Sequence, residues 1–192
     1  MKNSHLVVLA LIALAFFLRA KRRRTGATKP PSKKVEKLPQ PKPAPGWTAY
    51  REQLAQKESS GKYDARRAGS RYWGRYQLGP NARKVGGAAG VKWVKYKTDH
   101  ALQDAAVKKW SARLLSEIKA NPTLSAAIGK TLHGQKVTAA LLVAMDHLTG
   151  RAALMKWART GKTTKDGNGI ENLSYAQPFA KFDLSDLERA TT

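Results

Sequence analysis

The segment WTAYREQLAQKESSG, residues 47–61, determines how the rest of the chain is interpreted. Trp47, Tyr50, Leu54 and Glu58 recur three to four residues apart, which places them on one face of a helix. The Ser-Ser-Gly sequence at residues 59–61 favours termination of this helix. A carboxyl group at the end of an apolar face is partly removed from water, which favours its protonated form. Glu58 is therefore a candidate proton donor, with an ordinary solvated glutamate as the alternative.

The following segment, residues 62–79 (KYDARRAGSRYWGRYQLG), lacks helical periodicity and is rich in glycine and aromatic residues. This composition predicts a loop or a small hairpin. The aromatic residues are too many for all of them to belong to a core. We expect one or two of Tyr63, Tyr72, Trp73 and Tyr76 to line a groove where the apolar faces of sugars stack.

Later segments predict further helices. Residues 98–120 carry a cap at Thr98 or Asp99, then an apolar face, and they stop at Asn121-Pro122. The other expected helices share an apolar periodicity or a helix-terminating residue: a short one opened by Pro80, Val137–Leu148 ending near Gly150, Ala152–Thr160 ending at Gly161, and Leu173–Phe182 with a break at Pro178. Residues 47–192 are thus expected to form one mainly α domain with a small irregular or hairpin segment.

Three motifs follow Glu58-Ser59 in order: GRYQLG at residues 74–79, LLVAMDHLTG at 141–150, and TGKTTKDGNGIENLSYAQPFAKF at 160–182. Together the four motifs resemble the signature of lysozyme-like lytic transglycosylases and of phage peptidoglycan-degrading enzymes. The resemblance covers nearly all of residues 47–182. It implies a lysozyme-like fold, mainly α with a small irregular or hairpin segment.

The resemblance also implies cleavage of the β-1,4 bond between N-acetylmuramic acid and N-acetylglucosamine, with a 1,6-anhydro product. Glu58 then acts first as the acid and afterwards as the base. A hydrolytic lysozyme is the alternative, because hydrolysis uses a second carboxylate and Asp64 is the nearest candidate along the chain. Asp64 is otherwise a solvated loop residue or a partner of Arg66 or Arg67. The sequence leaves the two reactions open.

The same resemblance suggests roles for other residues. Ser59 orients the Glu58 carboxyl or binds the sugar, with a helix-end cap as the alternative. Gln77 binds an N-acetyl group, or it braces its loop. His147 stands where the family often has a tyrosine and lines the site, or it is a satisfied core histidine. Tyr175 is a weaker candidate for the cleft, and packing is its favoured role.

The composition points to an anionic partner. The net charge is +23, from 36 Lys and Arg against 13 Asp and Glu. Residues 1–46 hold eleven of the cations against one acid, and residues 47–192 hold the other 25 against 12. Such a field attracts acidic wall polymers such as those of peptidoglycan, anionic membrane lipid, or nucleic acid. A basic membrane protein that binds nucleic acid through its tail and head is therefore the main alternative to an enzyme.

We expect no metal and no cofactor. The chain has no cysteine, and its four histidines, at positions 5, 100, 133 and 147, show no metal-ligand spacing. The sequence TGKTT, residues 160–164, lacks the earlier glycine and the preceding strand of a phosphate-binding loop.

The N-terminal sequence predicts a membrane anchor, residues 1–19, and a basic Pro-rich linker, residues 20–46. Leu6–Leu18 is an uninterrupted apolar run of thirteen residues, followed by five cations within residues 19–24. This pattern favours a retained transmembrane helix over a cleaved signal peptide. The cations place the domain in the cytoplasm, away from peptidoglycan. An internal virion membrane of a bacteriophage, which meets the wall only during infection, resolves this conflict. A bacterial inner-membrane protein that faces the periplasm is the alternative.

Overall fold

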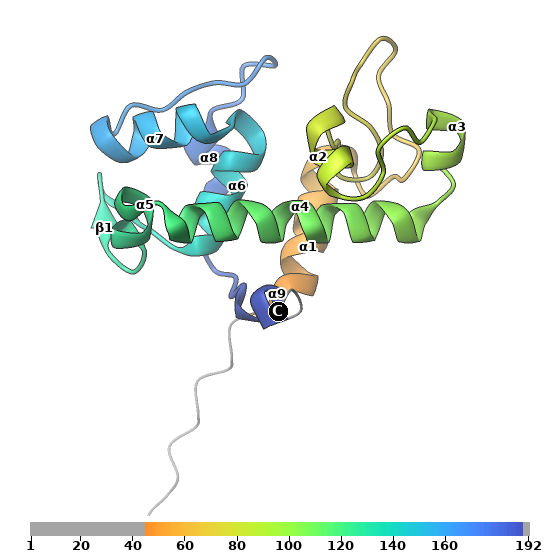
Figure 1. Ribbon diagram of the computed structural model, residues 1–192. Coiled ribbons are helices and arrows are strands. Elements are labelled where there is room, and N and C mark those ends of the chain that lie inside the picture. Colours follow the sequence, from red (N-terminus) through yellow and green to blue (C-terminus); the bar gives the residue numbers. More distant parts are fainter. Residues whose placement is uncertain (1–44, 190–192) are drawn as a thin grey trace, which may run out of the picture. The chain divides into compact units, whose positions relative to one another are not determined.

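Helices make up most of the chain that the structure describes, residues 45–189, which belong to one unit of the protein (Figure 1). The structure is a computed structural model. In chain order its elements are α1 (Trp47–Ser59), α2 (Pro80–Val85), α3 (Trp93–Tyr96), α4 (His100–Ala120), α5 (Pro122–Ala127), β1 (Thr131–Leu132), β2 (Gln135–Lys136), α6 (Ala139–Thr149), α7 (Arg151–Thr160), α8 (Asn172–Ala176), the 3-10 helix η1 (Gln177–Phe179) and α9 (Ser185–Arg189). The described chain is therefore mainly α, as the sequence predicts.

The predicted anchor, residues 1–19, and nearly all of the predicted linker, residues 20–46, lie outside the described residues. Within residues 45–189, no helix is both long enough and apolar enough to cross a membrane. The first described helix begins at Trp47, where the sequence places the start of the domain.

Side-chain caps begin the helices α4, α5 and α6. The Asp99 carboxylate accepts a hydrogen bond from the Leu102 N–H at 2.9 Å, so Asp99, one of the two predicted candidates, caps α4. Asn121 caps α5 and Thr138 caps α6 in the same way, through a side-chain oxygen. Such caps satisfy N–H groups that have no partner within the helix. The local sequence therefore determines where these helices begin.

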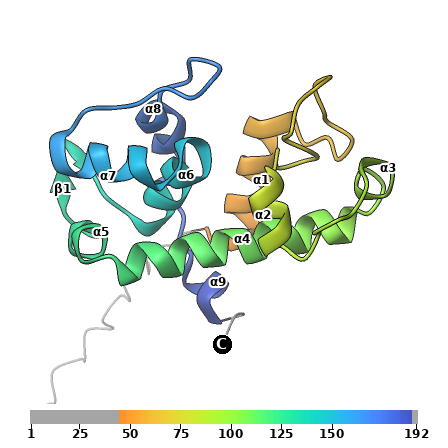
Figure 2. The ribbon, with the colours of Figure 1, turned by 45° about the horizontal axis from the view of Figure 1, so that its top comes forward.

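The central helix of the fold is α6. Its residues from Ala140 to Asp146 are all buried. The helices α4, α7 and α8 pack against it (Figure 2). A helix that is apolar around its whole circumference has to be covered on every side, and these three neighbours cover it. His147, the next residue, lies at the edge of this core.

The direction of α1 is set by aromatic packing against the C-terminal segment. The Tyr50 ring lies 5.0 Å from the Phe179 ring and 5.9 Å from the Phe182 ring, measured between centroids. At the start of α1, the Trp47 N–H donates to the Asp186 carboxylate at 3.0 Å. Aromatic pairs of this kind stabilise a fold beyond the area that they bury. They hold α1 so that its last turn comes next to α6 and α8.

A glycine allows α2 to lie directly against α4 (Figure 1). A Cβ atom built on Gly86 would lie only 2.6 Å from the Ala106 Cα. Any other residue at position 86 would therefore force the two segments apart.

The two-stranded sheet lies at residues 131–136, where the sequence predicts no strand. Residues 62–79, the predicted loop or hairpin, form a loop with an isolated bridge between Trp73 and Leu78, which agrees with the prediction. Strands of two residues are too short to show an alternating pattern, so the sequence carries no clear signal for them.

Three short helices are also missing from the sequence predictions. The helices α3, α5 and α9 span only four to six residues each, which is too short for periodicity to reveal. The helix expected over residues 173–182 ends at Ala176 and is followed by η1, which contains Pro178. Proline has no N–H group to continue the helical hydrogen bonds.

Candidate active site

Three helices bring side chains together at the end of α1. Glu58 lies in the last turn of α1. The Tyr175 hydroxyl of α8 donates a hydrogen bond to Glu58 Oε1. His147 Nε2 of α6 lies 3.8 Å from the same oxygen. The Glu58 side chain keeps 15% of its surface exposed, so the carboxyl is partly buried but accessible.

The end of α1 places Glu58 by local rules. Ser60 adopts the left-handed conformation with φ 55°, and the N–H groups of Ser60 and Gly61 bond to the carbonyls of Gln56 and Ala55. This pairing is the common glycine-assisted termination of a helix. It confirms the helix end that the sequence predicts. Tyr50 and Leu54, on the same face as Glu58, are fully buried, which confirms the predicted face.

Two tyrosine hydroxyls stay protonated beside the Glu58 carboxyl. Burial, and then the charge of Glu58 and its hydrogen bond, raise the pKa of Tyr175 well above its usual value. Burial, and then the charge of Glu58, also raise the pKa of Tyr50. Both hydroxyls therefore remain hydrogen-bond donors at neutral pH. Within the described residues, the Tyr50 hydroxyl has no hydrogen-bond partner.

Glu58 forms no ion pair with a lysine or arginine in the described part of the chain. Across residues 45–189, no Lys or Arg nitrogen lies within 4.0 Å of its carboxyl oxygens. Oε1 of Glu58 accepts the hydrogen bond from Tyr175, and Oε2 of Glu58 forms no hydrogen bond with the described part of the chain. In the protonated acid, Oε2 is thus the oxygen that can carry the proton. This arrangement suits a group that donates and accepts protons.

Ser59 connects α1 with the turn at residues 74–77. Its hydroxyl donates to the Arg75 carbonyl at 2.8 Å and to the Ala55 carbonyl at 3.3 Å. The hydroxyl is therefore engaged with the main chain, and no hydrogen bond joins it to the Glu58 carboxyl in the described structure. The alternative that Ser59 serves the helix end matches these contacts.

Tyr76 lies in the core rather than on a groove surface. Its side chain is fully buried, and its hydroxyl donates to Asp104 Oδ1 at 2.7 Å. Burial, and then the hydrogen bond with Asp104, raise the pKa of Tyr76, so it stays a donor. The expected contact with a sugar is corrected here, because the packing of α1 and α4 around the loop covers this ring.

Gln77 braces its own loop. Its side-chain amide donates to the Gly74 carbonyl at 2.7 Å and to the Ala65 carbonyl at 3.1 Å. Its backbone is left-handed, with φ 43°. Both amide donors are thus directed at the main chain, which matches the bracing alternative rather than binding of an N-acetyl group through the amide nitrogen.

A polar network holds this loop between α1 and α4. The Arg75 guanidinium pairs with Glu52 at 2.5 Å and donates to the Tyr63 hydroxyl at 2.7 Å. Tyr63 in turn donates to Asp104 at 3.0 Å, and Arg51 lies 3.4 Å from the same carboxylate. Connected hydrogen bonds of this kind strengthen one another in a partly buried setting. The sequence does not predict this network, because Asp104 lies 41 residues after Tyr63.

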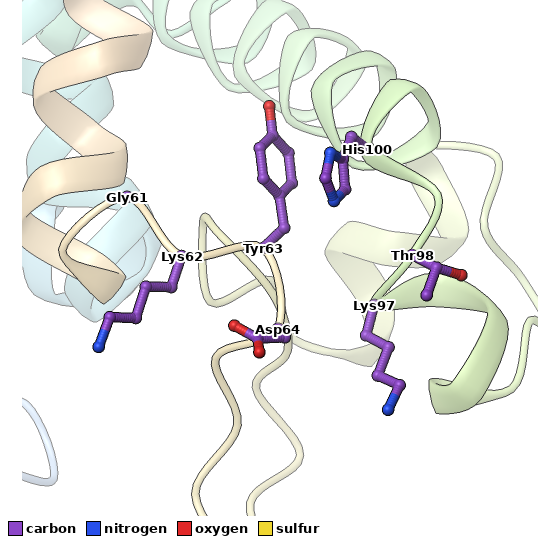
Figure 3. Close-up of a pocket in the computed structure, with 7 residues that line it drawn as sticks. All are labelled: Gly61, Lys62, Tyr63, Asp64, Lys97, Thr98 and His100. Carbon is purple, nitrogen blue, oxygen red and sulfur yellow. The ribbon is translucent and has the colours of Figure 1, made fainter.

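Tyr72 and Asp64 lie on the surface. Tyr72 is 53% exposed, so it remains available for a ligand. Asp64 is exposed and lines a cavity of about 680 Å³ whose lining residues do not include Glu58 (Figure 3). Asp64 forms no ion pair with Arg66 or Arg67 within the described residues. The contacts therefore do not link Asp64 to Glu58 as a second carboxylate.

Tyr175 is the residue of the site for which the sequence favours packing over a role in the cleft. It does pack, because its ring stacks on Phe179 with centroids 5.7 Å apart. Its hydroxyl also holds Glu58, which lies 117 residues earlier in the chain. A tyrosine in an apolar stretch shows no sequence signal for such a contact. No group of three or more potential metal ligands occurs in the part of the chain that the structure describes.

Comparison of the chain with protein-family models, with curated proteins and with solved structures gives no match. The interpretation of the site therefore rests on the geometry around Glu58 and on the motifs of the sequence.

Proposed function

We propose that the chain is a peptidoglycan lytic transglycosylase with a lysozyme-like fold, which cleaves the β-1,4 bond between N-acetylmuramic acid and N-acetylglucosamine. One observation carries the proposal: Glu58 ends α1 as a partly buried carboxyl that Tyr175 orients and that no Lys or Arg neutralises within residues 45–189. The ordered motifs of the sequence support it. The membrane setting and the role in infection stay predictions.

The carboxyl can serve as acid and then as base. In the first step, protonated Glu58 donates its Oε2 proton to the glycosidic oxygen, and the bond from that oxygen to C1 of the muramic acid breaks. The electron pair leaves with the oxygen, and the substrate's own acetamido oxygen stabilises the positive charge on C1. In the second step, the Glu58 carboxylate takes the proton of the C6 hydroxyl, and the oxygen of that hydroxyl forms a bond to C1. Glu58 is then protonated again, and no water is consumed.

The surroundings of Glu58 suit both steps. The carboxyl is partly buried, it accepts a hydrogen bond from Tyr175, and part of its surface stays accessible to a substrate. The His147 side chain, only 7% exposed, closes the site from α6 and limits the access of water to Oε1.

The products of the reaction test the proposal directly. The full-length protein, incubated with purified peptidoglycan, is expected to release fragments that end in 1,6-anhydromuramic acid. Mass spectrometry distinguishes these ends from reducing ends, because hydrolysis adds one water. Reducing ends would identify a hydrolase instead, and the absence of any fragment would exclude the proposed cleavage.

Tyr175→Phe is expected to lower kcat about 10- to 100-fold, with little change in KM. A hydrogen bond to a charged group contributes about 1.5–3 kcal/mol, which corresponds to this range of rates. The phenylalanine ring keeps the stacking on Phe179, so the melting temperature should change little. Tyr72→Phe is the matched control, because Tyr72 is exposed. Equal kcat values for Tyr175→Phe and the wild type would exclude the orienting role of the hydroxyl.

A further inference from the structure

Two adjoining cavities lie beside the loop that follows α1. The first has a volume of about 680 Å³ and is lined by Lys62, Asp64 and Lys97 among others (Figure 3). The second has a volume of about 420 Å³ and is lined by Arg66 and Arg67. Asp64 and Lys97 line both, so the two cavities form one continuous feature, which we term the basic pocket.

The cations of the basic pocket are not neutralised by the protein. Lys62, Arg66, Arg67 and Lys97 have no carboxylate within 4.0 Å among residues 45–189. Asp64, which lines both cavities, is likewise without an ion pair in the described chain. Charged side chains that line a cavity and have no ion-pair partner are suited to bind a charged ligand.

The aromatic rings of the pocket have neighbours on their faces already. Tyr63 stacks on His100 with centroids 3.9 Å apart, and Figure 3 shows these two rings facing each other. The Arg66 guanidinium lies over the Trp93 ring at 5.5 Å and over the Trp73 ring at 4.9 Å. Binding of single-stranded nucleic acid relies on free aromatic faces for base stacking. The pocket is therefore poorly suited to nucleobases.

The mixture of charges indicates the ligand class. A phosphate backbone carries one sign of charge only, and Asp64 at the centre of the pocket would repel it. A peptide with free carboxylates and an amino group matches both signs, with Arg67 and Lys97 as cations for its carboxylates and Asp64 as the carboxylate for its amino group. Arginine in particular binds carboxylates through two parallel hydrogen bonds.

We infer that the basic pocket binds the acidic stem peptide of a peptidoglycan strand. The inference rests on the proposed function, because the muramic acid whose bond is cleaved also carries this peptide. Gly61, which lines the pocket, follows Glu58 by only three residues. A strand positioned at Glu58 thus brings its peptide to the neighbouring surface of the loop.

Binding of a soluble stem peptide tests the pocket without catalysis. We would titrate the full-length protein, carrying Glu58→Gln, with a synthetic peptide that has free carboxylates and one amino group. Arg67→Gln together with Lys97→Gln should weaken binding about tenfold or more, whereas Lys156→Gln together with Arg159→Gln on α7 removes the same charge and should have no effect. The same peptide with amidated carboxylates should bind the parent protein at least about tenfold more weakly. Asp64→Asn should weaken the binding only of peptides that carry the amino group.

Equal affinity for the free and the amidated peptide, or unchanged binding by the Arg67 and Lys97 variant, would overturn the inference. So would an oligonucleotide that displaces the peptide and binds more tightly. Lys62→Gln serves as a second variant if the double variant melts early.

A turnover assay separates this inference from the proposed function. Wild-type protein should cleave peptide-bearing strands with a higher kcat/KM than strands stripped of peptide, and the double variant should lose only this preference. Cleavage without any preference would contradict the binding of the stem peptide in the basic pocket but would still agree with the proposed transglycosylase reaction. Peptide binding without any cleavage by the wild type would overturn the proposed reaction alone.

Discussion

Glu58→Gln is expected to reduce the cleavage of peptidoglycan by at least about a thousandfold, because general acid–base catalysis contributes on the order of 10²–10⁴ and this residue serves in both steps. Glutamine has nearly the same shape, and its side-chain carbonyl can still accept the hydrogen bond from Tyr175. The substitution therefore removes the proton without removing the packing. The release of anhydro-muropeptides over time is the appropriate measurement, with a melting curve to verify the fold.

Two control variants make this result specific. Glu171→Gln makes the same replacement of a carboxylate by an amide at the start of α8, where the side chain makes no capping hydrogen bond. This variant should keep wild-type activity. Asp64→Asn should retain cleavage of strands without peptide, because Asp64 lies outside the group of side chains around Glu58. A strong loss for Asp64→Asn on such strands would instead favour a two-carboxylate hydrolase. Activity of Glu58→Gln near that of the wild type would place catalysis elsewhere.

Arg151→Ala is expected to lower the free energy of unfolding by about 3 kcal/mol at neutral pH, because it leaves a buried carboxylate unpaired. Asp146, on the central helix α6, has a side chain only 3% exposed. Arg151 Nε donates to its Oδ2 at 2.8 Å, and a second guanidinium nitrogen lies 2.5 Å away. Arg151 also reaches Glu117 at 3.3 Å. The Arg113–Glu117 pair is exposed, so Arg113→Ala should cost only about 0.5 kcal/mol or less.

The effect should depend on pH in a defined direction. Burial raises the pKa of Asp146, and the opposing influence of Arg151 only reduces this shift. A raised pKa in the folded state means that the associated stability is present at low pH and is lost as pH rises through that pKa. Without Arg151, the pKa of Asp146 should rise further. The loss of stability in Arg151→Ala should therefore be largest near neutral pH and become smaller as the pH falls toward the raised pKa of Asp146.

Urea denaturation of both proteins at about pH 7.5 and about pH 5 measures this dependence. Adding Asp146→Asn to Arg151→Ala should recover part of the lost stability, because no buried charge then remains unpaired. A deficit that is equal at both pH values, and that Asp146→Asn does not reduce, would show that Arg151 acts through packing alone.

Local sequence predicts the helices with clear periodicity and caps. The face of α1, the end of α1 at Ser60-Gly61 and the cap of α4 at Asp99 all agree with the structure. Each depends on residues within one or two turns of one another, so the pattern is visible in a single stretch of sequence. The same reasoning fails for β1, β2, α3, α5 and α9, since elements of two to six residues stabilise themselves little and depend on their neighbours.

The roles of the aromatic residues depended on tertiary packing. Tyr76 and Tyr72 belong to one short loop and look alike in sequence. Tyr76 is nevertheless fully buried, with its hydroxyl bonded to Asp104, whereas Tyr72 is 53% exposed. The loop is irregular, so no period of two or 3.6 residues indicates which ring turns inward. Only the position of α4 beside the loop distinguishes them.

The sequence by itself determined that Glu58 ends an amphipathic helix, because helical periodicity and termination are local properties of the chain. Only the tertiary structure decided what surrounds that carboxyl. Tyr175 and His147 reach Glu58 from α8 and α6 because those helices pack beside the end of α1. Contacts between residues about a hundred positions apart depend on how whole helix faces fit together, and no short motif encodes that fit.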